Sequence, residues 1–132
     1  MPSKVMIIAG SDSGAGAGIQ GDLKTCMALG AYASTVITAI TAQNTLGVEA
    51  IFEIPTEHIE KQIHAVLRDI GADVIKTGML SSSAIVDTVV ETLDAYSQDA
   101  SRKLVVDPVM VAKGGSKLIN DKAVLNLEKK LI

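Results

Sequence analysis

Short apolar runs alternate with amphipathic segments along most of the chain. Buried or β-branched runs predict strands over residues 4–9, 32–41, 73–76 and 103–107. An alternating run over residues 48–54 stops at Pro55, which is typical of a short edge strand. Apolar residues at helical spacing predict helices over residues 18–29, 57–70, 83–96 and 121–131. The repeated strand–helix–strand order indicates an α/β fold, with a largely parallel sheet covered by helices on both faces.

We expect residues 1–132 to form a single domain, because the chain shows no internal repeat, low-complexity tract or linker. Residues 111–119 form the one longer polar loop of the pattern, in which Lys113 and Lys117 flank two glycines. That loop either covers bound ATP or is an ordinary solvated connection. The chain ends on Leu131-Ile132 without a polar tail, and from this we expect a truncated domain or one that pairs with a partner.

The composition narrows the class of protein. Hydrophobic residues make up 48% of the chain and aromatic residues only 2%, so the core is aliphatic. A net charge of −3 argues against nucleic-acid binding. The sequence contains no run of about 18 apolar residues, so no membrane span is predicted. The single cysteine, Cys26, forms no internal disulfide, and its apolar neighbours suggest a small core residue rather than a nucleophile. With no signal-peptide pattern at the N-terminus, we expect a cytoplasmic protein.

The segment with the clearest chemistry is a glycine-rich loop, residues 10–18, directly behind the first predicted strand. Glycines allow a close backbone approach, and the start of the following helix offers free N–H groups to a ligand. A Walker A loop is excluded because no lysine follows these glycines before Lys24. The dinucleotide fingerprint is also excluded, since its glycine spacing and its ribose-binding acid are both missing, and an NAD-dependent oxidoreductase is correspondingly disfavoured. A tight connection without any ligand remains the alternative.

Four motifs together resemble a known family. They are IAGSDSGAGAGIQGDLKT at residues 8–25, VITAITAQNT at 36–45, KTGML at 76–80 and VVDPVM at 105–110. In this order and spacing they are similar to the N-terminal part of the hydroxymethylpyrimidine/phosphomethylpyrimidine kinases, of the ribokinase-like superfamily. The resemblance implies a three-layer α/β/α fold and a phosphotransferase of thiamin biosynthesis. Such an enzyme uses Mg²⁺ and ATP to phosphorylate 4-amino-5-hydroxymethyl-2-methylpyrimidine and then its monophosphate, usually as a homodimer.

The resemblance also implies roles for particular residues. The Gln43 amide would pair with the aminopyrimidine edge, Met79 would contact the ring, and Asp22 would lie near the hydroxymethyl group. The structural alternatives are a loop-capping glutamine, a core methionine and an acid that suits the helix dipole. By the same resemblance the substrate-binding set is completed by Gly10, Asp12, Gly18 and Val109.

Two further charged residues follow predicted strands. Asp107 comes directly before Pro108, either on the Mg²⁺ side of the site or as a turn residue. Lys76 closes the strand at residues 73–76, where it either pairs with Asp107 or helps to hold phosphate. His58 and His64 are spaced i, i+6 and face different sides of their helix, so no metal cluster is predicted there.

The chain departs from the family pattern in length. Family members are close to twice as long, and their second half carries an N-x-x-E motif and a G-T-G-[CD] anion hole, neither of which occurs here. The resemblance therefore puts the catalytic Cys or Asp beyond residue 132, and we expect very low turnover from this chain alone. A non-catalytic pyrimidine-binding half-domain that needs a partner chain is the alternative, and a pyridoxine-type kinase is a further one. Ala15 stands where the family more often has glycine, a change that concerns loop stiffness.

Overall fold

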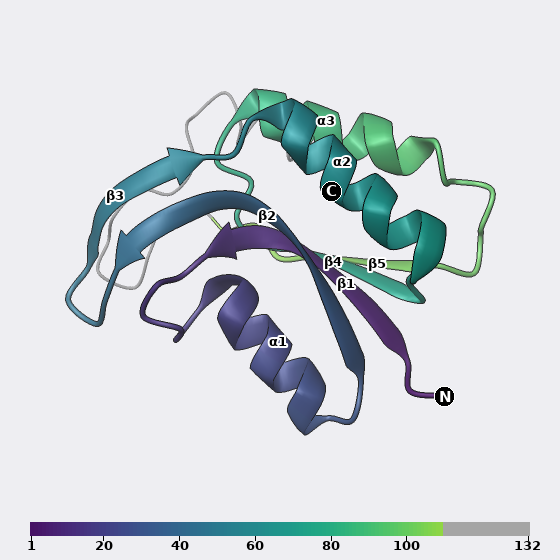
Figure 1. Ribbon diagram of the computed structural model, residues 1–132, viewed down its shortest axis with the longest axis horizontal. Coiled ribbons are helices and arrows are strands. Elements are labelled where there is room, and N and C mark those ends of the chain that lie inside the picture. The colour runs from purple at the N-terminus through teal and green to yellow at the C-terminus, as the bar shows by residue number, and fades with distance from the viewer. Residues whose placement is uncertain (110–132) are drawn as a thin grey trace.

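The computed structural model describes residues 1–109, which form a five-stranded sheet and three helices (Figure 1). The elements in chain order are β1 (Lys4–Ser11), α1 (Gly18–Ala28), β2 (Tyr32–Gln43), β3 (Val48–Glu53), α2 (Thr56–Asp69), β4 (Val74–Thr77), α3 (Ser83–Asp94) and β5 (Lys103–Val106). Every strand and helix predicted within these residues is present. The predicted loop 111–119, with Lys113 and Lys117, and the predicted helix 121–131 lie outside the described residues.

The sheet has the strand order β3-β2-β1-β4-β5. All neighbouring strands are parallel except β3, which pairs antiparallel with β2 at the edge. Helix α1 covers one face of the sheet, whereas α2 and α3 lie together on the other (Figure 1). This arrangement confirms the predicted three-layer, largely parallel α/β fold and the predicted edge strand. None of the helices in residues 1–109 is long and apolar enough to cross a membrane.

Strand β1 is the centre of the sheet and contributes to both layers of the core. Met6 and Ile8 are fully buried in the larger cluster, which packs against α2 and α3. Ile7 and Ala9 point the other way, into a smaller cluster under α1. Because successive side chains of a strand face opposite sides, a strand buried on both faces is apolar throughout, as its sequence shows. The predicted core residue Cys26 is half-buried and packs against the smaller cluster.

Strands β1 and β2 extend two residues further than the apolar pattern predicts. Ser11 pairs with Ile40 after a break in the register, and Gln43 pairs with Val48 of β3. A backbone ladder needs only N–H and C=O groups, so it continues through polar residues that a hydropathy pattern excludes. As a result, the polar side chains at the carboxyl ends of these strands are held by the sheet and not by a loop.

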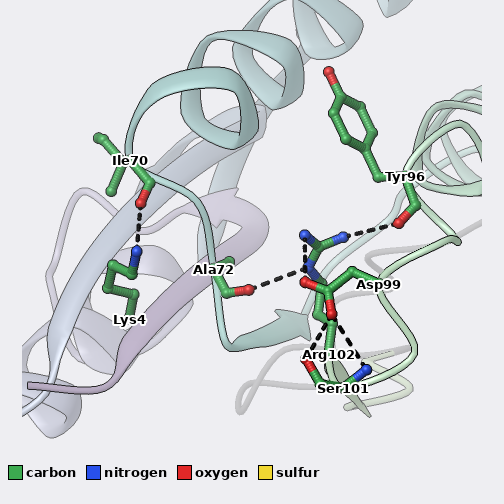
Figure 2. Close-up of polar contacts among 7 residues, drawn as sticks. All are labelled: Lys4, Ile70, Ala72, Tyr96, Asp99, Ser101 and Arg102. Carbon is green, nitrogen blue, oxygen red and sulfur yellow. Dashed lines mark hydrogen bonds and ion pairs between the residues drawn. The ribbon is translucent and has the colours of Figure 1, made fainter.

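Charged side chains bind the backbone at the amino ends of β1, β4 and β5, the end of the sheet opposite to the carboxyl ends (Figure 2). The Lys4 ammonium donates a hydrogen bond of 2.8 Å to the Ile70 carbonyl, just past the end of α2. Arg102 donates from Nε to the Ala72 carbonyl at 3.1 Å and from Nη1 to the Tyr96 carbonyl at 3.2 Å. These contacts connect the segments that enter β1, β4 and β5.

The third guanidinium contact is an ion pair between Arg102 and Asp99, at 3.3 Å (Figure 2). The Asp99 carboxylate also accepts hydrogen bonds from the hydroxyl and the N–H group of Ser101. The Ser101 hydroxyl bond, ahead of the other contacts, lowers the pKa of Asp99 below its usual value. The loop between α3 and β5 is thus organised around one arginine.

Candidate functional site

A cavity of about 270 Å³ lies at the carboxyl ends of the parallel strands, where open α/β sheets bind their ligands. Its lining comes from β1 and the glycine-rich loop, the start of α1, and the ends of β2, β4 and β5. It includes all eight residues that the sequence suggested for substrate or metal: Gly10, Asp12, Gly18, Asp22, Gln43, Met79, Asp107 and Val109. Their proximity follows from the strand order, which brings four segments far apart in sequence to one edge.

Asp12 organises the glycine-rich loop from inside. Its side chain is buried, with Oδ1 accepting from the Gly14 N–H at 2.8 Å. Oδ2 accepts from the N–H groups of Gly16 and Ala17 at 3.0 and 2.8 Å. The N–H groups of these three loop residues are therefore not available to a ligand, because a carboxylate of the loop itself already occupies them. The loop acts mainly as a shaped wall of the cavity.

Two glycines make this wall possible. Gly18, the first residue of α1, has a φ of 58°, and a Cβ there would lie 2.5 Å from the Gly10 carbonyl oxygen. A Cβ at Gly10 would collide with the terminal methyl of Met79. Met79 is buried and packs with Ala39 and Val109, so it belongs to a small core, and it also lines the cavity.

Ser13 fastens the loop to the end of β2. Its hydroxyl donates to the Gln43 carbonyl at 2.5 Å and accepts from the Gln43 N–H at 2.7 Å. The Gln43 side-chain oxygen lies 3.2 Å from the Thr41 hydroxyl. Within residues 1–109 the amide nitrogen of Gln43 forms no hydrogen bond. The backbone of Gln43 is thus fixed by the loop and the sheet, and the residue lines the cavity.

Lys76 lies between two carboxylates in the cavity wall. Its ammonium is 2.6 Å from Asp22 of α1 and 3.5 Å from Asp107, which follows β5. The predicted pairing with Asp107 is confirmed, but the shorter contact with Asp22 was missed. Alternation along β4 is the signal that could have found it: Ile75 faces the larger core, so Lys76 faces α1, where Asp22 lies.

Four smaller residues that the sequence did not indicate also line the cavity: Ala9, Ser11, Ala17 and Gly78. Gly78 has a clear steric function: a Cβ there would lie 2.9 Å from the Ala9 side chain and 3.3 Å from the Lys76 ammonium. The space for this ammonium therefore depends on the glycine of the Thr-Gly-Met turn, which the motif had already singled out.

The described residues contain no group of three or more His, Cys, Asp or Glu side chains that could hold a metal ion by themselves. Asp107, whose side chain is about half exposed (54%), is a single carboxylate at the cavity rim. Mg²⁺ in phosphoryl-transfer sites takes one or two carboxylates and completes its shell with phosphates and water. The residues present thus fit a Mg²⁺ ion that arrives with a nucleotide, and not a preformed protein cage.

Comparison with known proteins now decides the family. The family model described as "Phosphomethylpyrimidine kinase" matches residues 12–132. The chain belongs to the phosphomethylpyrimidine kinase family. Relatives from bacteria support this: the hydroxymethylpyrimidine/phosphomethylpyrimidine kinase of Bacillus subtilis is 45% identical over 129 residues, which cover 98% of this chain and 46% of that protein. The chain thus spans about half, or less, of the length of the curated relatives it matches.

Solved structures confirm the ribokinase-like fold of the family. The crystal structure of phosphomethylpyrimidine kinase from Clostridium difficile is 50% identical, with a TM-score of 0.88 over 98% of this chain and 55% of that one. Pyridoxal kinase from Staphylococcus aureus, solved with pyridoxal, is 38% identical with a TM-score of 0.84 over 99% of this chain and 46% of that one. The same S. aureus kinase has been solved with AMP-PCP, an ATP analogue, which supports ATP as the co-substrate of such kinases.

Proposed function

We propose that this chain forms the acceptor-binding half of a thiamin-biosynthesis kinase. The complete enzyme transfers the γ-phosphoryl group of ATP to the hydroxymethyl oxygen of 4-amino-5-hydroxymethyl-2-methylpyrimidine, and then to the resulting monophosphate. The observation that carries the proposal is that one cavity is lined by all eight residues that the sequence suggested for substrate or metal. Membership of the phosphomethylpyrimidine kinase family and the names of the relatives give the substrate class.

The proposed roles follow from the chemistry of the lining. An aminopyrimidine edge offers a donor beside an acceptor, and the side-chain amide of Gln43 complements both. The buried thioether of Met79 contacts the ring, while Gly10, Gly18 and Val109 shape the cavity around it. Asp12 keeps the loop in place through its three backbone contacts. Asp22, at the far side, accepts a hydrogen bond from the hydroxymethyl group.

Phosphoryl transfer depends chiefly on positioning and on charge stabilisation. Asp107 is the residue that would hold Mg²⁺, which when bound neutralises charge on the transferred phosphates. The described residues orient the acceptor, and the sequence lacks the G-T-G-[CD] motif that the family resemblance associates with catalysis. We therefore propose that the acceptor binds here and that turnover by this chain alone is very low.

Two alternatives have specific support. The 38% identity to a pyridoxal kinase solved with pyridoxal makes a vitamin B6 alcohol the second candidate acceptor. The coverage of about half of each bacterial relative is compatible with a pyrimidine-binding half-domain that acts with a partner chain. A homodimer and a cytoplasmic location also belong to the proposal, although a rice relative, 54% identical over 114 residues, is named as chloroplastic.

Thermal unfolding of the 132-residue chain tests the proposal. A ligand at about 100 times its Kd adds about 2.7 kcal/mol to the stability, which raises Tm by several degrees in a domain of this size. We expect this rise with the pyrimidine alcohol and a smaller one with pyridoxal. Gln43→Leu should abolish the rise, whereas Gln98→Leu, in an exposed loop, should preserve it.

The outcomes separate the alternatives. A larger rise with pyridoxal would favour the vitamin B6 acceptor, and no rise with either compound would refute acceptor binding by this chain. Addition of Mg-ATP with the pyrimidine should give no sustained release of ADP. Ordinary kinase turnover by the pure chain would show that catalysis does not need the missing motif.

A further inference from the structure

The cavity wall has an unusual balance of charge. Among the described lining residues there are three carboxylates, Asp12, Asp22 and Asp107, and one cation, Lys76. The negative charge of Asp12 is already stabilised by hydrogen bonds from three backbone N–H groups. The remaining charges form one connected group in which the Lys76 ammonium lies 2.6 Å from Asp22 and 3.5 Å from Asp107. This group carries a net charge of −1 and faces the space where an acceptor would lie.

Such a wall treats the two acceptors of the proposed function differently. The first, an alcohol, is neutral and can donate its hydroxyl hydrogen to a carboxylate. The second is a phosphate monoester with a charge close to −2 at neutral pH. Two carboxylates beside that phosphate would repel it, and the repulsion is stronger at short range and in a site of low dielectric. Among the described lining residues, Lys76 is the cation that can offset this repulsion when the phosphate arrives.

We propose that Lys76 is the residue that admits the phosphorylated acceptor, by transferring its ammonium from Asp22 to the monoester phosphate. This inference rests on the proposed function. An ammonium group has three donors on a flexible four-carbon stem, so it can exchange one anionic partner for another without movement of the backbone. The Lys76 side chain is 21% exposed and Gly78 leaves room beside its ammonium, so the exchange takes place within the cavity wall.

The exchange suits the chemistry of the second transfer. A phosphate oxygen of the monoester attacks the γ-phosphorus of ATP, a new P–O bond forms, and the bond from that phosphorus to ADP breaks with its electron pair going to ADP. A dianionic nucleophile has no proton to lose, so Asp22 is not needed at this step. In the first transfer the hydroxyl proton passes to a base, for which the family resemblance points to the Cys or Asp beyond residue 132, while Asp22 accepts the hydrogen bond of the alcohol with Lys76 still paired to it. The same two residues therefore take different partners in the two steps.

The binding test uses isothermal titration of the 132-residue chain with the pyrimidine alcohol and, separately, with its phosphate monoester. Lys76→Met should weaken monoester binding at least tenfold more than alcohol binding, the usual effect of losing a charge-assisted hydrogen bond. Lys76→Arg keeps the charge and should restore most of the monoester affinity. Lys61→Met is the matched control, because Lys61 is an exposed residue of α2 that pairs with Glu57.

Asp22→Asn gives a test of opposite sign. Without its closest anionic partner, Lys76 is freer to bind phosphate, so monoester affinity should rise severalfold while alcohol affinity falls. A merely structural ion pair would instead lower both affinities together. Melting curves of each variant establish that it is folded, and if Lys76→Met is not, Lys76→Arg and Asp22→Asn still decide.

Equal losses for the two acceptors in Lys76→Met, or weaker monoester binding in Asp22→Asn, would overturn the inference. A wild-type chain that binds the alcohol but not the monoester would refute it as well, with the proposed acceptor site intact. A wild-type chain that binds neither compound would refute the proposed function and this inference with it.

Discussion

The amino ends and the carboxyl ends of the parallel strands both carry charged side chains, but the side chains bind different partners at the two ends. At the amino ends of the strands, Lys4 and Arg102 donate mainly to backbone carbonyls, which cannot leave (Figure 2). At the carboxyl ends, Lys76 pairs with two side-chain carboxylates in a cavity wall. A contact to the backbone fixes the fold, whereas a contact between two side chains can be exchanged for a contact to a ligand. The partner of a charged group, more than its type, thus separates a structural role from a functional one.

Asp12 is the exception that makes the comparison useful. It lies at the functional edge and lines the cavity, yet its carboxylate is bound to three backbone N–H groups, like the residues of the opposite edge. If backbone contacts define a structural role, substitution of Asp12 should mainly lower the free energy of unfolding. It should change acceptor affinity only indirectly, by altering the shape of the loop.

The largest expected effect is that of Asp12→Asn. Asparagine keeps one acceptor oxygen and replaces the other with a donor, so at least one buried N–H of the loop loses its partner. Hydrogen bonds to charged groups contribute about 1.5–3 kcal/mol each, and we expect a loss of about 3 kcal/mol in the free energy of unfolding by urea. Asp73→Asn is the control, because the Asp73 carboxylate accepts a hydrogen bond from the Lys4 N–H, which an amide oxygen can keep. Equal losses in the two variants would contradict the role of Asp12.

A smaller loss is expected at the other edge for Arg102→Met. The methionine fills similar space but leaves the Ala72 carbonyl without its donor and the Tyr96 carbonyl with only the longer contact from the Asp99 N–H, at 3.4 Å, which should cost about 2 kcal/mol in urea unfolding. The affinity of the folded variant for the pyrimidine alcohol should be unchanged, since Arg102 does not line the cavity. Arg68→Met, on the exposed side of α2, should change neither quantity. Weakened acceptor binding in Arg102→Met would show that the two edges are coupled.

The sequence, with the family resemblance, was sufficient for the architecture and for eight of the residues that line the cavity. The apolar runs of β1 and the amphipathic pattern of α2 depend on periodicity, which burial imposes directly. Gln43 and Asp107 follow predicted strands, whose carboxyl ends meet at one edge of a parallel sheet, and the family resemblance supplied the proposed role of Gln43. Contacts that depend on side-chain direction were harder: alternation along β4 places Lys76 on the side of α1, but it does not identify Asp22 as the residue that Lys76 contacts.

That the Asp12 carboxylate occupies the N–H groups of the loop was missed for a related reason. Hydrogen bonds from Gly14, Gly16 and Ala17 to Asp12 are local, but they require a loop conformation that glycine-rich sequences do not determine. A buried acid within a run of glycines is the pattern that could have suggested an internal anion. It is the same arrangement that a bound phosphate would otherwise satisfy.

The smallest expected effect tests the backbone of the loop itself. Ala15 has a φ of 61°, a left-handed conformation that costs a non-glycine residue about 1–2 kcal/mol. Ala15→Gly removes this strain but adds about 0.4–1 kcal/mol of unfolded-state entropy, so we expect a net gain of about 0.5 kcal/mol, measured as a small rise in Tm. Ala17→Gly is the matched control: its φ of −138° carries no such strain, and glycine there should lower Tm. A fall in Tm for both variants would mean that the strain at Ala15 is relieved elsewhere in the loop.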